Sequence, residues 1–381
     1  MKKLMSFLLA AVMVLSLAAC SSSAETGEAE TEGLSETEAG QKPETVTVAS
    51  LNGDKEETEV EIPYDPQRVA ILDFAVLDII DNLGLGDRVV GTASTTLDYL
   101  MSYTEKEGVT LLGTIKEADL EAVMGCEPDV IFIGGRLSAY YDELSEIAPV
   151  VFLSIDVTQE GVVDGTYRIA KTAASIFGME DEIVEKTAGF DARIEALAAA
   201  AEGKTAVVGM CTSGSFNVLG DDGRCSIIGR EIGFNNLSNT VTSDESESGS
   251  SRGQGGENGG SDESRGSGEG SEGGRSSGGS ENSESSEGGT STHGNEASFE
   301  LLVSLAPEYI FVLDRDAAIA TDGAQLAQEI MENDLVMSTD AYKNGNIVYL
   351  AHPNAWYTAE GGITALDYML SDLESALLNE D

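Results

Sequence analysis

Two arginines occupy the same position in an internal repeat of the sequence. The segment from Asp119 to Arg136 aligns without gaps to the segment from Ser298 to Arg315, and each copy reads as a helix, a proline, a buried strand and the arginine. In open α/β sheets, ligands bind at the carboxyl ends of the strands. A guanidinium stays ionised and offers paired N–H donors that match paired oxygens. The repeat therefore predicts two facing rims that hold an anion.

The alternative for these arginines is an ordinary surface role in which they pair with nearby carboxylates. The chain has 68 Asp and Glu against 21 Lys and Arg, and its formal net charge is −47. This charge argues against nucleic acid and anionic membrane surfaces as partners. In so acidic a protein, two arginines at equivalent places in a repeat favour a pocket between two lobes.

The motifs of several common enzyme classes are missing from the sequence. The sequence has no P-loop, no GxSxG nucleophile elbow and no GxGxxG after a strand, and only two histidines. After Cys20, the cysteines are Cys126, Cys211 and Cys225, without CxxC spacing, which excludes a disulfide framework and a cysteine zinc site. A Cys211–Cys225 bridge is one reading of them, and buried small apolar side chains are the favoured one. An enzyme is not expected.

The secondary-structure pattern predicts an α/β protein with two Rossmann-like lobes. Short strand patterns alternate with helical ones on both sides of a long, Ala-rich helical stretch that is interrupted at Gly178. We expect an N-terminal lobe over 46–163, which begins with a hairpin at Asn52-Gly53, and a C-terminal lobe over 204–381. Residues 164–203 form the predicted connecting helix, long and rigid, and the ligand cleft lies between the lobes.

A segment of biased composition interrupts the second lobe. Residues 243–296 contain 16 Gly and 16 Ser among 54 positions, with charged residues scattered among them. Such a segment buries too little apolar surface to offset its ordering entropy. We predict a disordered insertion here, of unknown purpose.

The N-terminus has the features of an export signal. Lys2 and Lys3 precede an apolar run too short to span a bilayer, and Leu17-Ala-Ala-Cys20 resembles the bacterial lipobox, which places lipidation on Cys20. The alternative is an ordinary signal peptide in which the cysteine is incidental. We assign residues 1–20 to the lipoprotein signal peptide. The Glu-rich residues 21–45 that follow are predicted to form a disordered tether.

Three segments carry a resemblance to a known family. The arginine of each repeat and the dipeptide Trp356-Tyr357 look like those of surface or periplasmic siderophore-binding proteins of the ferric-catecholate type, which serve ABC importers. The resemblance covers residues 66–378 apart from the insertion. The general two-lobe pattern is shared with cobalamin-, haem- and hydroxamate-binding relatives. The segments are Gly135-Arg136-Leu-Ser-Ala-Tyr-Tyr-Asp-Glu-Leu, Leu313-Asp-Arg315-Asp-Ala-Ala-Ile and Ala355-Trp-Tyr357.

The resemblance implies three arginines that face an anionic iron complex. Arg136 and Arg315 match two of them, and Arg224 matches the third. It also implies a histidine and a tyrosine that can bind ferric iron directly, for which His293 and Tyr357 are the candidates. Phenolate oxygen suits the hard ion Fe(III), and imidazole is an acceptable ligand. The alternatives are a solvated His293 and a Tyr357 that only lines the pocket.

The remaining expectations concern the ligand's surroundings and the partner. The single tryptophan, Trp356, neighbours Tyr357 and is assigned to the ligand site. Glu121 and Glu300, one in each repeat, correspond to the glutamates that meet the permease in the family. Their alternative role is favourable placement of a carboxylate near a helix N-terminus.

The expected function is capture of an anionic ferric siderophore outside the cytoplasm and its delivery to an ABC importer. The protein is expected to be a lipid-anchored monomer without an intrinsic cofactor, whose ligand is an Fe(III)–siderophore complex. Another ferric chelate, haem or cobalamin is the alternative ligand. A surface adhesive or structural lipoprotein is the more distant alternative, because it leaves the paired arginines unexplained.

Overall fold

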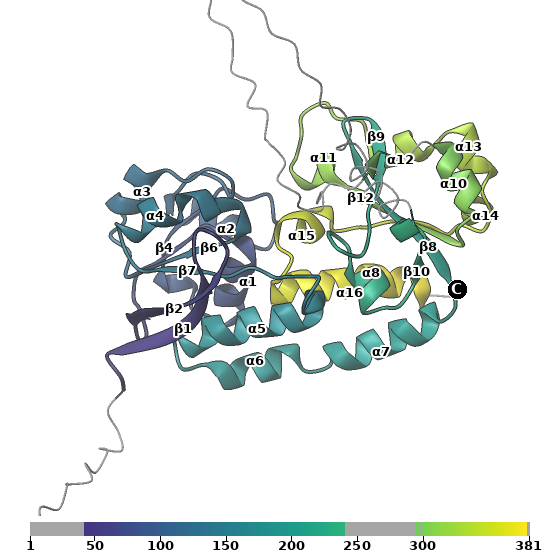
Figure 1. The fold of residues 1–381 in the computed structure, drawn as a ribbon. Coiled ribbons are helices and arrows are strands. Elements are labelled where there is room, and N and C mark those ends of the chain that lie inside the picture. The colour runs from purple at the N-terminus through teal and green to yellow at the C-terminus, as the bar shows by residue number, and fades with distance from the viewer. Residues whose placement is uncertain (1–41, 241–294, 297–298, 379–381) are drawn as a thin grey trace, which may run out of the picture. The chain divides into compact units, whose positions relative to one another are not determined.

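A parallel sheet with strand order β5-β4-β3-β6-β7 forms the centre of the N-terminal lobe (Figure 1). The computed structural model describes residues 42–240, 295–296 and 299–378. Every residue of β3 and β6 is buried, as expected where helices cover both faces of a parallel sheet. The strands are β3 (Val69–Ile71), β4 (Val89–Thr92), β5 (Thr110–Leu111), β6 (Val130–Ile133) and β7 (Val150–Phe152). The helices are α1 (Phe74–Asn82), η1 (Gly86–Arg88), α2 (Met101–Glu105), α3 (Leu120–Gly125), η2 (Gly135–Tyr140) and α4 (Tyr141–Ser145).

An antiparallel hairpin precedes this sheet, as the sequence predicts. Strands β1 (Thr45–Leu51) and β2 (Glu57–Pro63) pair from Thr45 opposite Pro63 to Leu51 opposite Glu57. The side chain of Asn52 accepts hydrogen bonds from the backbone N–H groups of Asp54 and Glu56, which closes the turn.

The predicted connecting helix is divided into three. Helices α5 (Gly161–Ser175), α6 (Glu180–Thr187) and α7 (Phe190–Ala201) follow one another beneath the two lobes in Figure 1. Gly178 and Gly189 lie at the two breaks with φ of 65° and 99°, in the left-handed region that favours glycine. The expectation of a single helix over 164–203 interrupted only at Gly178 is therefore wrong at Gly189, where the chain turns a second time.

A mixed sheet forms the centre of the C-terminal lobe. Its strand order is β11-β9-β8-β12-β13, with β10 paired to β8; β12 runs parallel to β8 and β13, and β9 is antiparallel to β8. The strands are β8 (Thr205–Thr212), β9 (Ser215–Val218), β10 (Asn235–Asn236), β11 (Asn295–Glu296), β12 (Tyr309–Asp314) and β13 (Ile347–Tyr349). The helices are α8 (Ile227–Arg230), α10 (Phe299–Leu305), α11 (Arg315–Ala318), α12 (Ala327–Met331), α13 (Asp334–Ser338), α14 (Asp340–Lys343), α15 (Pro353–Thr358) and α16 (Ile363–Leu377).

The end of the predicted insertion is ordered as a strand. Residues 241–294 lie outside the described chain, but Asn295 and Glu296 pair antiparallel with Val218 and Asn217 of β9. The predicted range 243–296 therefore extends too far at its C-terminal end, because these two residues satisfy backbone groups at the edge of the sheet.

The internal repeat is visible in the backbone. Glu127 and Ala306, which are equivalent in the repeat, have positive φ angles of 43° and 46°. Another equivalent pair, two residues further on, acts alike: Asp129 accepts from the backbone N–H of Arg68 at 2.9 Å, and Glu308 accepts from that of Thr205 at 2.9 Å. In both lobes a carboxylate thus fixes the start of the neighbouring strand.

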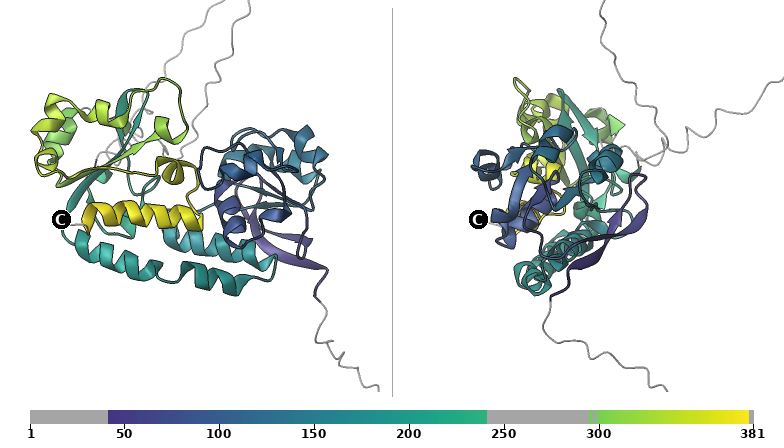
Figure 2. Two further views of the ribbon diagram at one scale, coloured as in Figure 1. Left: turned by 180° about the vertical axis from the view of Figure 1, so that it is seen from behind. Right: turned by 90° about the vertical axis from the view of Figure 1, so that its left-hand side faces the viewer.

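Helix α16 joins the lobes and the connector. It packs against α1 of the N-terminal lobe, against α5 and α7, and against α15 (Figure 2). Arg193 on α7 donates to both carboxylate oxygens of Glu374 on α16, at 2.7 and 2.8 Å, and pairs with Asp367. The described residues from Pro43 onward belong to one compact unit.

The cysteines of the described chain fill the interior. Cys126, Cys211 and Cys225 are buried and free, which confirms the prediction of buried small side chains and leaves no Cys211–Cys225 bridge. Within the described residues, no helix is long and apolar enough to cross a membrane.

Candidate anion-binding site

Three arginines reach one tyrosine from different parts of the chain. Arg136 lies in η2 just after β6, and Arg315 is the first residue of α11 directly after β12. Arg224 lies in the loop between β9 and α8. The two repeat arginines therefore stand where parallel strands end, as the sequence predicts.

The carbonyl and the hydroxyl of Tyr357 accept hydrogen bonds from these arginines. Arg136 donates through Nη2 to the carbonyl oxygen at 2.8 Å, and Arg224 donates through Nη1 to the same oxygen at 2.6 Å. Arg315 donates through Nε to the phenolic hydroxyl at 3.0 Å. The carbonyl belongs to the last turn of α15, where the partial negative charge of a helix end favours cations.

The aromatic ring of Tyr357 also attracts the guanidinium groups. The guanidinium carbon of Arg224 lies 4.0 Å from the ring centroid, that of Arg315 at 5.6 Å and that of Arg136 at 5.9 Å. All three distances are within the range of a cation–π interaction. Tyr357 is thus a platform that holds three cations together, against their mutual repulsion.

Arg315 has further partners that fix its position. Its Nη1 donates to the hydroxyl of Thr212 at 3.3 Å and to Asp316 at 3.2 Å. Asp316 is 4% exposed, and it also accepts from the backbone N–H of Ser213 at 2.7 Å. This buried carboxylate offsets part of the positive charge on Arg315.

The environment of Tyr357 favours its phenolate. Burial by itself raises the pKa of Tyr357, but the hydrogen bond from Arg315 and the charges of Arg224, Arg315 and Lys116 outweigh it, so the pKa lies below its usual value. Lys116, which follows β5, is a cation that the sequence reasoning missed. Its position after a strand was the signal that could have found it.

A half-buried glutamate lies within reach of the charges of Arg136 and Arg224. Glu360 follows α15, and its Oε1 is buried without a hydrogen-bond partner. Desolvation raises the pKa of Glu360 to about 7, although the charges of Arg224 and Arg136 oppose this. No pattern in the sequence distinguishes this glutamate from the many others.

The pKa of Arg136 reflects the crowding of cations. Burial is the main cause that lowers it, and the charge of Arg224 adds to the effect, while Asp73, Tyr357 and Glu360 act in the opposite direction. Asp73 reaches this region because Gly134 lacks a side chain: a Cβ there would lie 2.0 Å from the Asp73 carboxylate.

Trp356 does not belong to this cluster. It is 0% exposed, and its indole N–H donates to Asp372 at 2.9 Å in the interior. Trp356 thus points away from the arginines, because consecutive helical residues point about 100° apart and only Tyr357 faces them; its assignment to the ligand site stays a prediction. His352 also binds Asp372, through Nδ1 at 2.7 Å, which agrees with a structural role.

The other predicted functional residues lie elsewhere. Glu121 on α3 and Glu300 on α10 are exposed at equivalent places on the two lobes. Cys20 and His293 lie outside the described residues. Among the residues that are described, no group of three or more His, Cys, Asp or Glu side chains is arranged to hold a metal ion.

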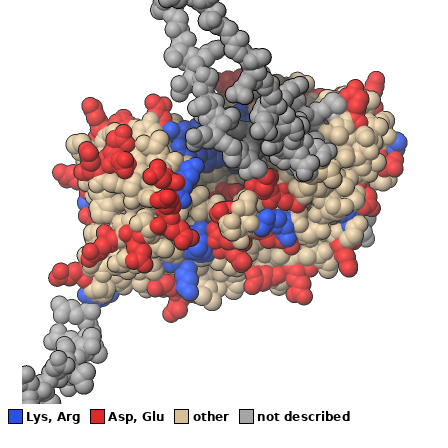
Figure 3. Space-filling model, viewed as in Figure 1, with Lys and Arg blue, Asp and Glu red and all other residues tan. Residues whose placement is uncertain are grey.

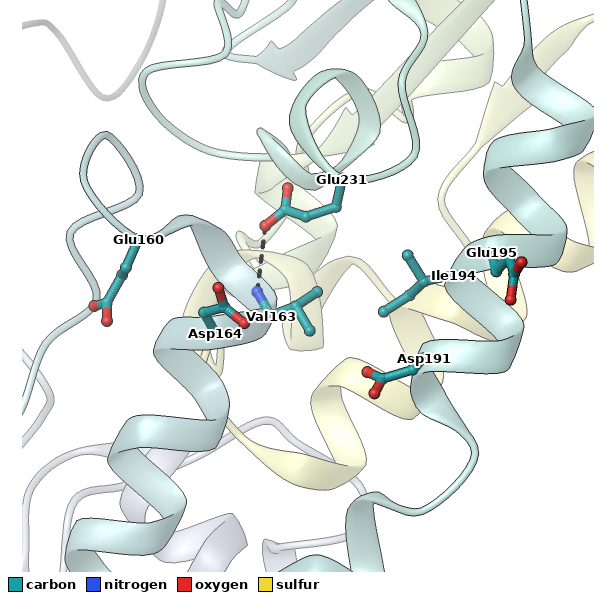
Figure 4. A pocket seen from close by; sticks show the side chains of 7 residues that line it. All are labelled: Glu160, Val163, Asp164, Asp191, Ile194, Glu195 and Glu231. Atoms are coloured by element: carbon teal, nitrogen blue, oxygen red, sulfur yellow. Dashed lines mark hydrogen bonds between the residues drawn. The ribbon is translucent and has the colours of Figure 1, made fainter. Parts of the chain in front are cut away.

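A hollow elsewhere in the protein is lined by negative charges. It lies beside α5 and α7, has a volume of about 320 Å³, and would repel an anion (Figure 4). One of its carboxylates, Glu231, accepts from the backbone N–H groups of Val162 and Val163 at the start of α5, and so caps that helix. Its lining residues are Glu160, Val163, Asp164, Asp191, Ile194, Glu195 and Glu231.

Acidic side chains are spread over the face drawn in Figure 3, while basic ones gather in a narrower band.

A family model described as periplasmic binding protein matches residues 69–251 and 279–353, more than half of the chain. The chain belongs to the periplasmic binding protein family. The family resemblance predicted from the arginine and Trp-Tyr segments is thereby confirmed.

Several relatives of this periplasmic binding protein are characterised. The petrobactin-binding protein YclQ of Bacillus subtilis is 27% identical over 341 residues, which cover 88% of this chain and 89% of YclQ. The crystal structure of YclQ has a TM-score of 0.70 and covers 89% of this chain and 100% of its own. The catecholate-siderophore binding protein VctP of Vibrio cholerae has a TM-score of 0.66 at 27% identity, with coverage of 87% and 100%.

A further relative belongs to an iron uptake transporter. PiuA of Streptococcus pneumoniae is the substrate-binding protein of an iron uptake ABC transporter, and its structure has a TM-score of 0.68 at 25% identity, covering 88% of this chain and 100% of its own. These relatives confirm the predicted α/β fold class and the predicted class of protein. This chain is therefore a substrate-binding protein of a family whose members are binding proteins and not enzymes.

Proposed function

We propose that this periplasmic binding protein captures an anionic ferric siderophore of the catecholate type through Arg136, Arg224 and Arg315. The observation that supports this most directly is the convergence of the three guanidinium groups on Tyr357. A ferric tris-catecholate has excess negative charge, because its phenolate oxygens outweigh Fe(III). Guanidinium N–H groups can donate in pairs to such oxygens.

The relatives support the same ligand class. YclQ binds petrobactin and VctP binds catecholate siderophores, as their names state. The cations in this chain suit a multiply charged ligand, with Lys116 as a fourth positive group near Tyr357. A neutral ligand such as cobalamin would add no negative charge to balance these cations, which is unfavourable for partly buried groups.

Tyr357 has two roles in the proposal. It is 3% exposed, so in the described state it supports the arginines rather than facing solvent. Direct coordination of iron by its phenolate requires the hydrogen bond from Arg315 to open. Coordination by Tyr357 and by His293 therefore remains a prediction for siderophores that leave positions on the iron unfilled.

Capture is proposed to proceed without covalent chemistry. The ligand enters between the lobes, the arginines neutralise it, and only modest closure follows, because α16 and the connector hold both lobes. Glu121 and Glu300 then contact cations of the permease. We further propose that the protein is a monomer anchored through a lipid on Cys20.

The test is calorimetric titration with iron complexes of different charge. The panel consists of a ferric tris-catecholate, a ferric bis-catecholate, ferric citrate, a neutral ferric hydroxamate, haem and cyanocobalamin. Calorimetry is preferable to a titration followed by tryptophan fluorescence, because Trp356 is buried away from the arginines. The proposal predicts the tightest binding for a catecholate complex; tightest binding of a neutral ligand would refute it.

A further inference from the structure

Two large apolar side chains are exposed at the same position of the repeat. Met124 on α3 is 61% exposed, and Val303 on α10 is 41% exposed. Each stands three residues after the glutamate of its repeat, Glu121 or Glu300. A single exposed apolar residue needs no explanation, but a matched pair on two lobes does.

The surroundings of the two positions are also alike. The six residues Leu120–Gly125 of α3 and the equivalent residues 299–304 show the same order of exposure: the second, fifth and sixth are exposed and the fourth is buried. Residues three apart on a helix lie on one face, so Met124 is next to Glu121 and Val303 next to Glu300.

Each lobe adds a second exposed apolar residue beside its helix. Strand β5 packs against α3 and leaves Leu111 48% exposed. Helix α13 packs against α10 and leaves Leu335 38% exposed. Each lobe therefore presents a small apolar area next to a carboxylate.

The two helices that carry Met124 and Val303 lie on one side of the protein. In Figure 1, α3 and α10 are both on the upper side, and α6 and α7 run along the lower side; a turn about the vertical axis keeps this arrangement in Figure 2. A single partner on this side can therefore meet α3 and α10 at once without contacting α6 and α7.

We propose that Met124 and Val303 each insert into an apolar recess of the importer's permease, beside the cation that meets Glu121 or Glu300. This inference rests on the proposed function, and it adds the apolar half of the docking surface. Because the two areas are equivalent, the permease face must present two similar recesses, each with a lysine or arginine at its edge. A few side chains that fill desolvated pockets carry much of the affinity at protein interfaces, and methionine is enriched there.

The test measures binding of the full protein to the purified importer permease in nanodiscs by surface plasmon resonance. Met124→Ser and Val303→Ser should each weaken binding about tenfold, and the double variant about a hundredfold, as expected when an anchoring side chain is lost. Val184→Ser is the matched control: Val184 is 70% exposed but lies on α6, so its replacement should change nothing.

Calorimetry with the ferric complex should give unchanged ligand affinity for all variants, which separates this inference from the proposed function. A double variant that binds the permease as tightly as the unmodified protein would overturn the inference. So would a double variant that changes the oligomeric state without permease, measured by light scattering, because the areas would then face a second copy of this chain. If the unmodified protein binds none of the iron complexes, the proposed function is overturned instead.

Discussion

The guanidinium of Arg224 lies over the ring of Tyr357, 4.0 Å from the ring centroid, and donates to the carbonyl oxygen of the same residue at 2.6 Å. One residue thus holds this cation through both its ring and its backbone. The Nε of Arg224 is buried without a hydrogen-bond partner. An unsatisfied buried donor is unfavourable, and oxygens of a bound anion would satisfy it.

Replacement of Tyr357 separates its ring from its hydroxyl. Tyr357→Phe keeps the ring and the carbonyl and removes only the acceptor for Arg315, so affinity for a ferric tris-catecholate should fall by about threefold to tenfold. Tyr357→Ala removes the platform for all three arginines, and the loss should be about a hundredfold. Calorimetric titration measures both, and equal losses would show that the ring has no supporting role.

The phenylalanine variant also tests coordination of iron. If Tyr357 binds Fe(III) in a bis-catecholate complex, the charge-transfer absorption of the bound complex should differ between the unmodified protein and Tyr357→Phe, beyond the catecholate-to-iron absorption that both share. The tris-catecholate complex, whose iron is already saturated, is the control and should give the same spectrum with both proteins. Identical bis-catecholate spectra with the two proteins would rule out direct coordination.

Replacement of Arg315 tests the charge argument. Arg315→Ala should weaken binding of a triply charged ferric complex by about thirtyfold, since a hydrogen bond to a charged group contributes about 1.5–3 kcal/mol. Binding of a neutral ferric hydroxamate should change by less than about threefold. Arg315→Lys keeps the charge but lacks the forked donors. Its affinity for the triply charged complex should lie between that of the unmodified protein and that of Arg315→Ala. Equal losses for charged and neutral complexes would contradict a role for charge.

Ionisation of Glu360 should make ligand binding depend on pH. With a pKa of about 7, this half-buried carboxylate is charged at pH 8 and offsets Arg136 and Arg224, and it becomes neutral at pH 6. Affinity for an anionic ferric complex should therefore rise as the pH falls from 8 to 6. Glu360→Gln should remove this part of the dependence, whereas the exposed Glu329→Gln should retain it. Parallel pH profiles for all three proteins would refute the role of Glu360.

The same group affects stability. Its pKa is raised in the folded protein above the ordinary value of 4.5, so the folded state binds more protons between these values, and the free energy of unfolding falls as the pH rises from 4.5 to about 7. Glu360→Gln should accordingly stabilise the protein at pH 8 and have less effect at pH 5. Urea unfolding at the two pH values measures the difference.

Arg193 should stabilise the joint between the connector and α16. Its guanidinium bonds to Asp367, Ser371 and Glu374, and its side chain is 25% exposed. Arg193→Ala should lower the free energy of unfolding by about 1–2 kcal/mol, after allowance for solvent screening. Urea unfolding measures this, with the exposed Lys186→Ala on α6 as control. An unchanged midpoint would show that packing alone holds α7 against α16.

The sequence by itself determined the two lobes and the positions of Arg136 and Arg315. Both follow from local rules: buried strands read as continuous apolar runs, and a repeat places equivalent residues at equivalent strand ends. The sequence also placed Glu121 and Glu300 on exposed helix positions. The break of the connector at Gly189 was missed, because one glycine within a helical pattern is a weak signal.

Only the tertiary structure decided what the arginines contact. Arg136 and Tyr357 are 221 positions apart in the chain, and no local pattern predicts that a backbone carbonyl will accept from two guanidinium groups. It also placed Trp356 in the core and Tyr357 among the arginines, because the packing of α15 on its neighbours selects which helix face is buried. The raised pKa of Glu360 likewise depends on burial, which arises from long-range packing.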